Sequence, residues 1–455
     1  MKLAKLSLAA MVVAGLASSS FAASTTLEDA FKNGKVNGEL KAWYFERFAD
    51  DASARKNENI ISTAATLGYV TDSLYGFTFG ATFQGSANPA TATTDAKQTF
   101  RNDEYAGGGV LSEAYLAYTL GKTTVKAGRQ FMDTPLVSGS GSRIYKESFE
   151  GVFITNTDLP QTTLLAAYVD KFQGRTSNVS ANGATANGTL GDAPKFRNSA
   201  AFTGGGNAGM TLEFEDAYSA GLINKSISNL TLIAQYAVVK DVAKWDDVDV
   251  YYTEANYVLP VAGFKLGFDA NVRGSHTGDG KNTAGTSMKA LQLDGTYTAG
   301  RISLSDLAGF GFSFAGATVS ESDAVVAGMG NGPTSYTSTM IRGTSTRMMA
   351  DTDSYLFAAS YDFSKIGVAG LTALAQYGWT SEGKNAKVST GGAPTTAEAA
   401  DYTNIAVGLT YAVPALKGLT TSVQYEAQEK DFKNKTATNG KQDTDELWFK
   451  AGYKF

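Results

Sequence analysis

Residue types that usually carry out enzymatic chemistry are sparse in this chain of 455 residues. It contains one histidine, His276, and no cysteine. A serine–histidine hydrolase would therefore depend on His276 alone, and no Gly-x-Ser-x-Gly sequence surrounds a candidate nucleophile. Transition-metal sites built from His and Cys are disfavoured for the same reason. We predict that the protein is not an enzyme and that it uses no cofactor.

An acidic cluster at Asp246, Asp247 and Asp249 is the one arrangement that could attract a metal ion, namely Ca²⁺. It lacks the ligand spacing of a dedicated calcium loop, so a solvated loop is the simpler interpretation. The formal net charge is −5, which gives no sign of the basic surface that nucleic acids require. We therefore expect no nucleic-acid partner.

Most of the chain consists of segments with a period of two residues. Gly76–Gly85 and Gly263–Ser275 alternate apolar with polar side chains over their whole length. Such alternation predicts strands that have one apolar and one polar face. Aromatic residues occupy the ends of several apolar faces, as at Tyr377 and Trp379, and this is typical of the aromatic girdles of a membrane barrel.

The connections between these segments alternate between short and long. Short ones such as Asp72–Gly76 and Leu259–Gly263 are followed by long polar ones such as Ser86–Gly109 and Ser320–Asp351. This asymmetry predicts an all-β fold: a transmembrane antiparallel β-barrel with short periplasmic turns and long extracellular loops. The segments number about 18, with 16 as the alternative, and barrels of this size leave an aqueous channel. Residues 209–223 and 287–298 are counted among these strands.

The two ends of the chain indicate where it is targeted. Lys2 and Lys5 precede a short apolar stretch, Leu6–Leu16, and small residues lead to Ala22. This pattern predicts a signal peptide over residues 1–22, with a buried N-terminal helix as the alternative. Residues 23–455 then form a single barrel domain in the outer membrane of a Gram-negative bacterium, in contact with its lipid bilayer.

The last residues alternate up to a terminal aromatic residue, Phe455, with Phe449 and Tyr453 on the same face. The chain is therefore expected to end on a strand that closes the barrel against the first strand.

The segment Ala127–Gly151 resembles the third-loop region of the OprD-type porins. The matching residues are Gly128, Gln130, Thr134-Pro135-Leu136, Arg143, Phe149 and Gly151. Leu27–Phe45, followed by Arg47, is similar to the opening of the related major outer-membrane porins of Campylobacter and its relatives. Gly141 and Tyr145-Lys146 depart from the pattern of many members, so the resemblance carries no particular substrate preference.

The resemblance implies several properties. Residues 131–149 would form a third loop that folds into the lumen and narrows it. Tyr453 and Phe455 would form the signal that the barrel assembly machinery recognises. Relatives of the Campylobacter type imply a homotrimer, and the OprD type implies a ladder of basic residues that guides carboxylates, although no such ladder can be aligned in this sequence.

Charges on such a loop would act in a reduced dielectric and could therefore select among ions. Arg143 and Lys146 are the candidates for the positive side of the constriction. Asp133 and Glu147 lie on the same loop and either oppose them or are solvated loop charges. Arg129 shares the parity of outward-facing residues, so it lies beyond the bilayer edge or follows a bulge.

Strand parity also predicts which charged side chains line the lumen, either as selective groups or as wall residues that keep the pore wet. They are Glu113, Lys126, Lys265, Asp269, Arg273, Asp294, Glu426, Lys430, Lys450 and Lys454.

Together these patterns predict a porin: a water-filled channel for passive diffusion of ions and small hydrophilic solutes. The alternative is a structural or adhesive barrel that acts through its outer loops, a hypothesis motivated by residues 173–208 and 320–351.

Overall fold

The computed structural model describes residues 24–49, 57–87, 92–177, 191–203, 210–281, 285, 287–342, 348–383, 399–433 and 440–455. The expected signal peptide, residues 1–22, lies outside the described residues. Within the described part of the chain, no helix is long and apolar enough to cross a membrane.

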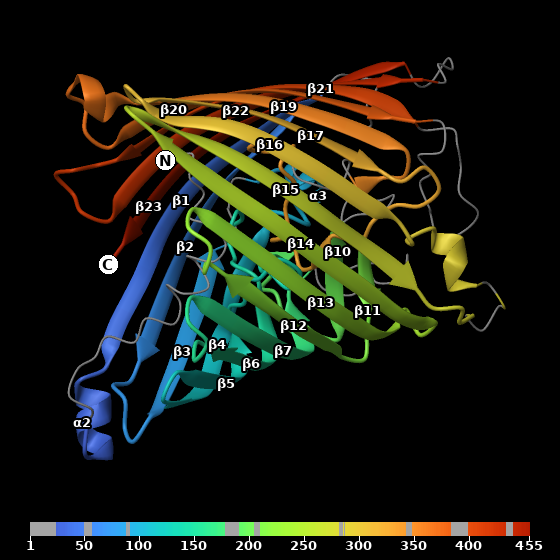
Figure 1. Ribbon diagram of the computed structural model, residues 1–455. Helices are drawn as coiled ribbons and strands as arrows, with labels where there is room; N and C mark the ends of the chain where they lie inside the picture. The colour runs from blue at the N-terminus through green and yellow to red at the C-terminus, as the bar shows by residue number, and fades with distance from the viewer. Residues whose placement is uncertain are drawn as a thin grey trace.

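Eighteen antiparallel strands form a closed barrel, so the predicted fold is confirmed (Figure 1). Closure comes from β1, which pairs with β2 along one edge and with the last strand, β23, along the other. The barrel strands are β1 (Lys35–Ala49), β2 (Glu58–Val70), β3 (Phe77–Ala87), β4 (Ala106–Leu120), β5 (Thr123–Gln130), β6 (Ser148–Asn156), β7 (Thr162–Gln173), β12 (Ala217–Asn224), β13 (Leu230–Val242), β14 (Asp246–Val261), β15 (Phe264–Thr277), β16 (Thr296–Leu307), β17 (Phe310–Val319), β19 (Thr352–Asp362), β20 (Leu371–Glu382), β21 (Ala400–Ala412), β22 (Leu419–Phe432) and β23 (Lys441–Lys454).

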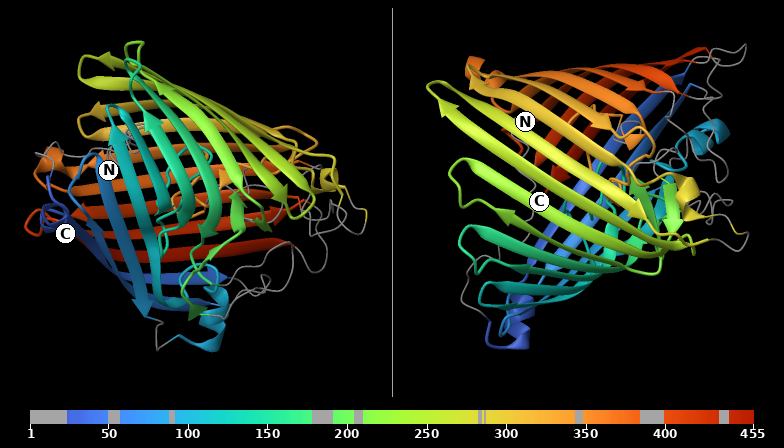
Figure 2. Two further views of the ribbon diagram at one scale, coloured as in Figure 1. Left: turned by 90° about the horizontal axis from the view of Figure 1, so that it is seen from below. Right: turned by 45° about the vertical axis from the view of Figure 1, so that its right-hand side comes forward.

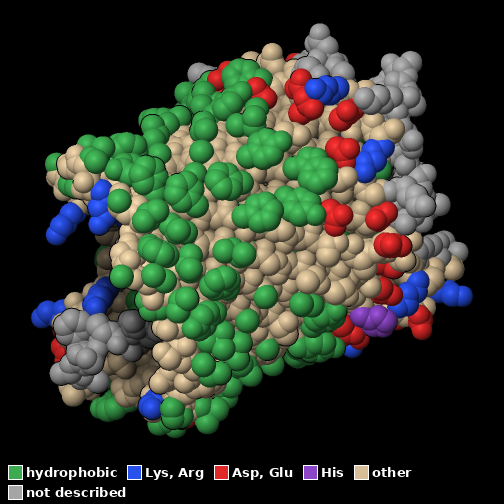
Figure 3. Space-filling model, turned by 45° about the horizontal axis from the view of Figure 1, so that its top comes forward, with side chains coloured by type: hydrophobic (Ala, Val, Ile, Leu, Met, Phe, Trp, Pro, Cys, Tyr) green, Lys and Arg blue, Asp and Glu red, His purple; other side chains and the backbone are tan. Residues whose placement is uncertain are grey.

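The two faces of the wall follow the alternation of the sequence. In β19, Tyr355 and Phe357 are exposed on the outer face, whereas Ser354 and Leu356, which alternate with them, are buried on the inner face. Tyr355 stacks on Trp379 of β20 with ring centroids 5.6 Å apart. Figure 3 shows hydrophobic side chains spread over the middle of one side of the barrel, with acidic side chains gathered toward the long-loop end and Lys and Arg side chains at both ends. This is the arrangement that a bilayer-spanning wall requires.

The short connections lie at the end of the barrel where the C-terminus and α2 (Leu27–Lys32) are found (Figures 1 and 2). One turn shows why glycine is needed there. Gly76 has a φ of +88°, and a Cβ at this position would lie 2.6 Å from the carbonyl oxygen of Thr119. The next turn, between β4 and β5, consists of Gly121 and Lys122 alone, so the predicted asymmetry of the connections is present.

Two predicted strands differ from the structure. Residues 287–298 do not form one strand: a 3₁₀ helix, η1 (Met288–Leu291), occupies its start, and β16 begins only at Thr296. The hydroxyl of Ser287 accepts a hydrogen bond from the amide of Lys289, and Gln292 has a φ of +51°, so the chain turns here instead of extending. Residues 209–223 are divided into β11 (Met210–Glu213) and β12, and only β12 belongs to the barrel.

The long-loop side carries the short helix α3 (Thr94–Thr99), which precedes β4, and several short strands. A second 3₁₀ helix, η3 (Phe363–Ile366), lies at the opposite end, in the short turn between β19 and β20. Short strands β8 (Gly191–Asp192) and β9 (Phe196–Arg197) attach to β4 and β7 respectively.

A small separate sheet joins loops that are distant in the sequence. It consists of β10 (Ser199–Thr203), β11 and β18 (Gly328–Met329). Phe202, Leu212 and Met329 of this sheet share one buried cluster with Leu136 and with Val239 of the barrel wall. The loops therefore pack inward against the wall.

Candidate channel constriction

The loop between β5 and β6, residues 131–147, folds into the barrel. The amide of Leu136 donates to Oε1 of Gln235 on β13 at 3.0 Å, and the amide of Ser138 donates to the carbonyl of Met329 at 3.1 Å. On the other side of the barrel, Nζ of Lys41 on β1 donates to the carbonyl of Ile144 at 3.2 Å. The loop thus reaches from one wall to the opposite wall.

A second inward segment, residues 324–342, was not predicted from the sequence. Its start is held by Arg273 of β15, whose Nη1 donates to the carbonyl of Ala327 at 3.1 Å. Its end is held by Glu426 of β22, whose Oε2 accepts from the amides of Ile341 at 2.9 Å and Arg342 at 3.2 Å. Between these points Met329 joins the first loop through its amide, which donates to Leu136 at 2.7 Å. Both loops therefore lie inside the barrel and contact each other there.

Arg143 lies at the tip of the first loop, among acidic and aromatic groups. Its Nε is 3.2 Å from Oδ1 of Asp103 and 3.8 Å from Oε1 of Glu104. Its guanidinium also lies over the ring of Trp448 on β23, 4.6 Å from the ring centroid. These contacts place Arg143 inside the barrel, between the segment before β4 and the wall strand β23.

Lys450 stands beside Arg143 in an aromatic cage. Its Nζ is 4.2 Å from the ring centroid of Trp448 and 4.5 Å from that of Trp43, and it donates to the carbonyl of Ser142 at 3.0 Å. Aromatic faces attract cations, and here they hold the ammonium against the loop. The inner face of β1 and β23 therefore presents positive charge next to aromatic rings.

An ion-pair network continues along this wall. Glu446 of β23 pairs with Nε of Arg47 at 2.8 Å and with Nη2 of Arg342 at 3.2 Å. Arg47 also reaches Oδ2 of Asp103 at 3.4 Å. Charges from β1, β23 and both inward loops thus form one connected cluster.

The neighbouring carboxyls Asp103 and Glu104 differ in protonation. Burial opposes ionisation of Asp103, but the guanidinium groups of Arg143 and Arg47 outweigh it and hold the pKa of Asp103 well below its usual range. Burial dominates at Glu104 and raises its pKa to about 8, although Arg143 acts in the opposite direction. Neither residue could be predicted from the sequence, because both lie before β4 in a segment without periodicity.

Comparison with known proteins agrees with this geometry. Residues 1–199 match the family model of the Campylobacter major outer membrane protein. The fold matches OpdQ of Pseudomonas aeruginosa at 17% identity, covering 94% of this chain and 99% of that chain with a TM-score of 0.68. The chain is similar to the OprD-type porins. OccK9 (OpdG) of the same organism matches at 15% identity over 94% and 100% of the two chains, with a TM-score of 0.71. OpdK with vanillate matches at 17% identity over 93% and 99%, with a TM-score of 0.69. Among curated proteins, none matches this chain.

The other charged residues of the third loop of this OprD-like barrel are held by the loop itself or by its neighbours. Glu147 is buried and accepts from the amides of Ser140 at 2.8 Å and Asn331 at 3.0 Å, and its Oε1 lies 3.3 Å from Nε of Arg175. This carboxylate is neither a solvated charge nor an open pore group, because it joins the two inward loops. Asp133 accepts from the hydroxyl of Ser138 at 2.7 Å.

Lys146 lies over the ring of Phe131, with its Nζ 4.2 Å from the ring centroid. Burial lowers the pKa of Lys146, whereas the nearby carboxylate of Glu113 raises it.

Several predicted lumen residues form pairs on the inner face. Lys126 lies 3.3 Å from Glu113, and Asp269 lies 2.7 Å from Nη2 of Arg301. Lys265 pairs with Asp306 at 2.9 Å near the short-turn end. The charged groups of these pairs largely compensate each other.

The remaining predicted lumen residues have different surroundings. Arg273 and Glu426 hold the segment 324–342. Lys430 lies over Phe432, 4.1 Å from its ring centroid, and Lys454 is exposed at the short-turn end.

The prediction that Asp294 lies on a wall strand was wrong, because β16 starts two residues later. Its Oδ2 accepts from Nζ of Lys289 at 2.6 Å. Its Oδ1 accepts from the hydroxyl of Thr277 at 2.7 Å.

Arg129 faces the outside of the barrel. It lies directly across from Glu150 in the β5–β6 register and pairs with it at 2.8 Å, and its guanidinium covers Phe196 at 4.3 Å. Glu150 also binds Lys171 at 2.9 Å. Arg129 therefore stays on the outer face, where it binds Glu150 of the neighbouring strand, and no bulge turns it inward.

The acidic cluster does not converge on a common point. Asp246 accepts from the amide of Gly280 at 2.7 Å, Asp247 binds Lys240, and Asp249 accepts from the hydroxyl of Tyr236 at 2.8 Å. In the part of the chain that the structure describes, no three His, Cys, Asp or Glu side chains are grouped as a metal site would need.

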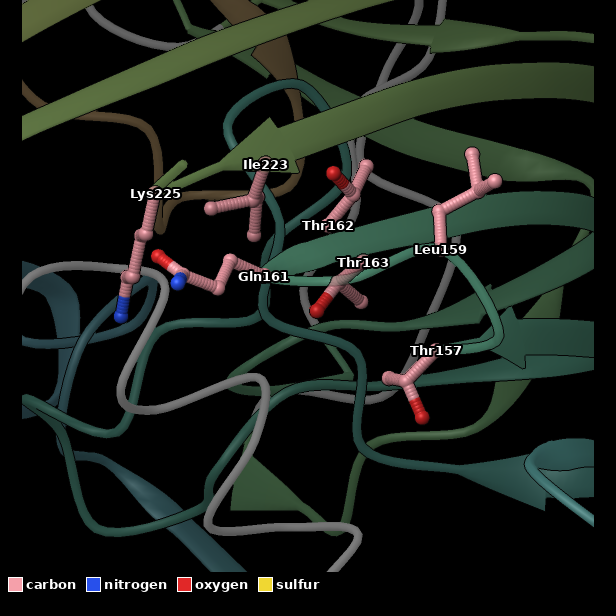
Figure 4. Close-up of a pocket in the computed structure, with 7 residues that line it drawn as sticks. All are labelled: Thr157, Leu159, Gln161, Thr162, Thr163, Ile223 and Lys225. Carbon is pink, nitrogen blue, oxygen red and sulfur yellow. The ribbon is translucent and has the colours of Figure 1, made fainter. Parts of the chain in front are cut away.

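A shallow pocket lies at the short-turn rim, away from the loops (Figure 4). Gln161 and Lys225 line it from neighbouring turns, with Leu159 and Ile223 beside them. It is separate from the constriction, because its residues belong to the turns after β6 and β12.

Proposed function

We propose that the chain forms a water-filled channel in the outer membrane of a Gram-negative bacterium, through which ions and small hydrophilic solutes diffuse passively. The observation that carries the proposal is a closed barrel of 18 strands whose lumen is narrowed by two inward loops that bring Arg143 and Lys450 together. Such a site holds fixed charges along a narrow aqueous path, where they act more strongly than in bulk water.

Liposome swelling tests this proposal directly. Proteoliposomes that contain the purified protein should swell in isosmotic solutions of small sugars and amino acids, and the rate should fall as the solute becomes larger. Swelling no faster than that of protein-free liposomes, for every solute, would contradict the proposal.

We infer that small carboxylates, and aromatic ones first, are preferred solutes. The solved structure of OpdK contains vanillate, and this chain places Arg143 and Lys450 beside Trp43 and Trp448. These groups suit a ligand that has an anionic end and a flat ring. Vanillate should therefore reduce single-channel current at lower concentration than vanillyl alcohol, which lacks the carboxylate. Equal effects of the two compounds would contradict the preference.

Export and assembly belong to the same proposal. We infer cleavage of the signal peptide after Ala22, recognition of Tyr453 and Phe455 by the barrel assembly machinery, and a homotrimeric channel.

An adhesive role has less support than the channel, because residues 324–342 of the long loop point into the lumen. No catalytic role is proposed. The only histidine, His276, is exposed on the long-loop side, and its Nδ1 lies 3.7 Å from the carboxylate of Asp294.

A further inference from the structure

Glu104 carries a buried carboxyl group at the charged end of the constriction. It follows α3 and immediately precedes Tyr105 and β4, and its side chain is fully buried. Its backbone carbonyl accepts from the hydroxyl of Ser62 at 3.2 Å. Neither of its carboxyl oxygens has a hydrogen-bond partner among the described residues. A buried carboxyl without such partners needs a physical explanation.

The charged groups around Glu104 come from five parts of the chain, and most are basic. They are Arg143 of the first inward loop, Lys41 of β1, Lys450 of β23, Arg175 after β7, and the adjacent Asp103. The closest is Arg143, whose Nε lies 3.8 Å away and donates its hydrogen bond to Asp103 instead. Glu104 is therefore not a fixed ion-pair partner of these basic residues. Its carboxyl group can be either neutral or negatively charged beside them.

We propose that Glu104 is a selectivity-determining residue: its protonation state sets the net charge that permeating ions meet beside Arg143 and Lys450. The inference rests on the proposed channel function and identifies a residue that regulates ion selectivity at the same constriction. Glu104 does not touch the permeating ion, because it is buried. It acts through the electric field at the two cationic side chains that line the passage.

The direction of the effect follows from the surroundings. Burial raises the pKa of Glu104 to about 8, with Arg143 opposing this shift. Below that pH the carboxyl is neutral, so the positive charge of Arg143 and Lys450 is less compensated and anions are favoured. Above it the carboxylate cancels one positive charge, and anion preference falls. In a medium of low dielectric constant, a single charge at this distance has a large effect.

Reversal potentials across a KCl gradient in planar bilayers, at pH 6 and pH 9.5, test the inference. For the wild-type channel we expect the ratio of chloride to potassium permeability to fall about two- to fivefold between the two pH values. Glu104→Gln is isosteric with the neutral carboxyl, so the ratio should fall clearly less in this variant than in the wild type, and any remaining fall would come from Lys450. Glu321→Gln, an exposed loop carboxylate, is the matched control and should behave as the wild type.

Two outcomes would overturn the inference: a wild-type ratio that does not change with pH, or a change that persists in full in Glu104→Gln. The second would assign the titration to another group, such as Lys450. Absence of any current at either pH is a different result, because it contradicts the proposed channel itself. If Glu104→Gln does not insert, Glu104→Asp, which retains the titrating group, must show the wild-type fall, and a constant ratio in that variant overturns the inference.

Discussion

At the scale of single residues, we expect ion selectivity to depend most on Arg143. It is held by Asp103 and by the ring of Trp448, so its guanidinium has a fixed position beside the passage. Arg143→Ala removes a positive charge and leaves Asp103 paired with Arg47 alone, so the channel should become more selective for cations. We expect the chloride-to-potassium permeability ratio to fall about two- to tenfold, measured as a reversal potential in a KCl gradient. Arg129→Ala, on the outer face, is the control and should leave the ratio unchanged; an equal shift in both variants would refute the role of Arg143.

The charges on the barrel wall could be predicted from sequence, whereas those on the loops could not. A strand repeats every two residues, so counting alone predicts that Lys126, Asp269 and Lys450 share the inner face, and in the structure they contact Glu113, Arg301 and Trp448. Glu104 lies outside any periodic segment, and the basic groups that surround it, Arg143, Lys41 and Lys450, are far away in the sequence. Parity alone could not show that Asp294 lies outside β16.

At the scale of elements, the unexpected feature is the inward course of residues 324–342. The apolar residues at its start, Ala324–Ala327 and Met329, are buried, whereas nothing local in the polar remainder of the segment requires an inward course. The direction is set by wall residues that bind its backbone, chiefly Glu426, whose two oxygens accept from Thr339, Ile341, Arg342 and Asn404. The sequence placed Glu426 on the inner face but could not show what it binds.

Glu426→Gln should release this segment from β22. The amide NH₂ of the glutamine would face the backbone N–H groups of the segment, so two donors would oppose each other. The free energy of docking the segment against β22 should become less favourable by about 2–4 kcal/mol. The channel should then show higher or noisier conductance, and the segment should be cut more readily by protease in detergent. Glu429→Gln, an exposed position on the same strand paired with Lys441, is the control and should have neither effect. Unchanged conductance and protease resistance in Glu426→Gln would show that other contacts suffice to hold the loop.

At the scale of the whole molecule, closure of the barrel depends on the pairing of the first and last strands. Beyond the pairing of β1 with β23, Phe455 and Gly38 exchange backbone hydrogen bonds of 2.9 and 3.1 Å. Deletion of Phe455 should reduce the amount of folded barrel in the outer membrane, measured by heat-modifiable mobility in gels. Leu416→Ala, at an exposed short turn, is the control and should assemble normally. Normal assembly of the deletion variant would argue against a role for the terminal residue.

The architecture itself was predictable, because eighteen segments with one apolar face leave few alternatives to a closed membrane barrel. What the barrel does depends on whether its lumen conducts. The most direct test is single-channel recording of the purified protein in a planar bilayer. A water-filled channel predicts discrete, ohmic current steps in KCl on each insertion. Electrical silence over many verified insertions would contradict it.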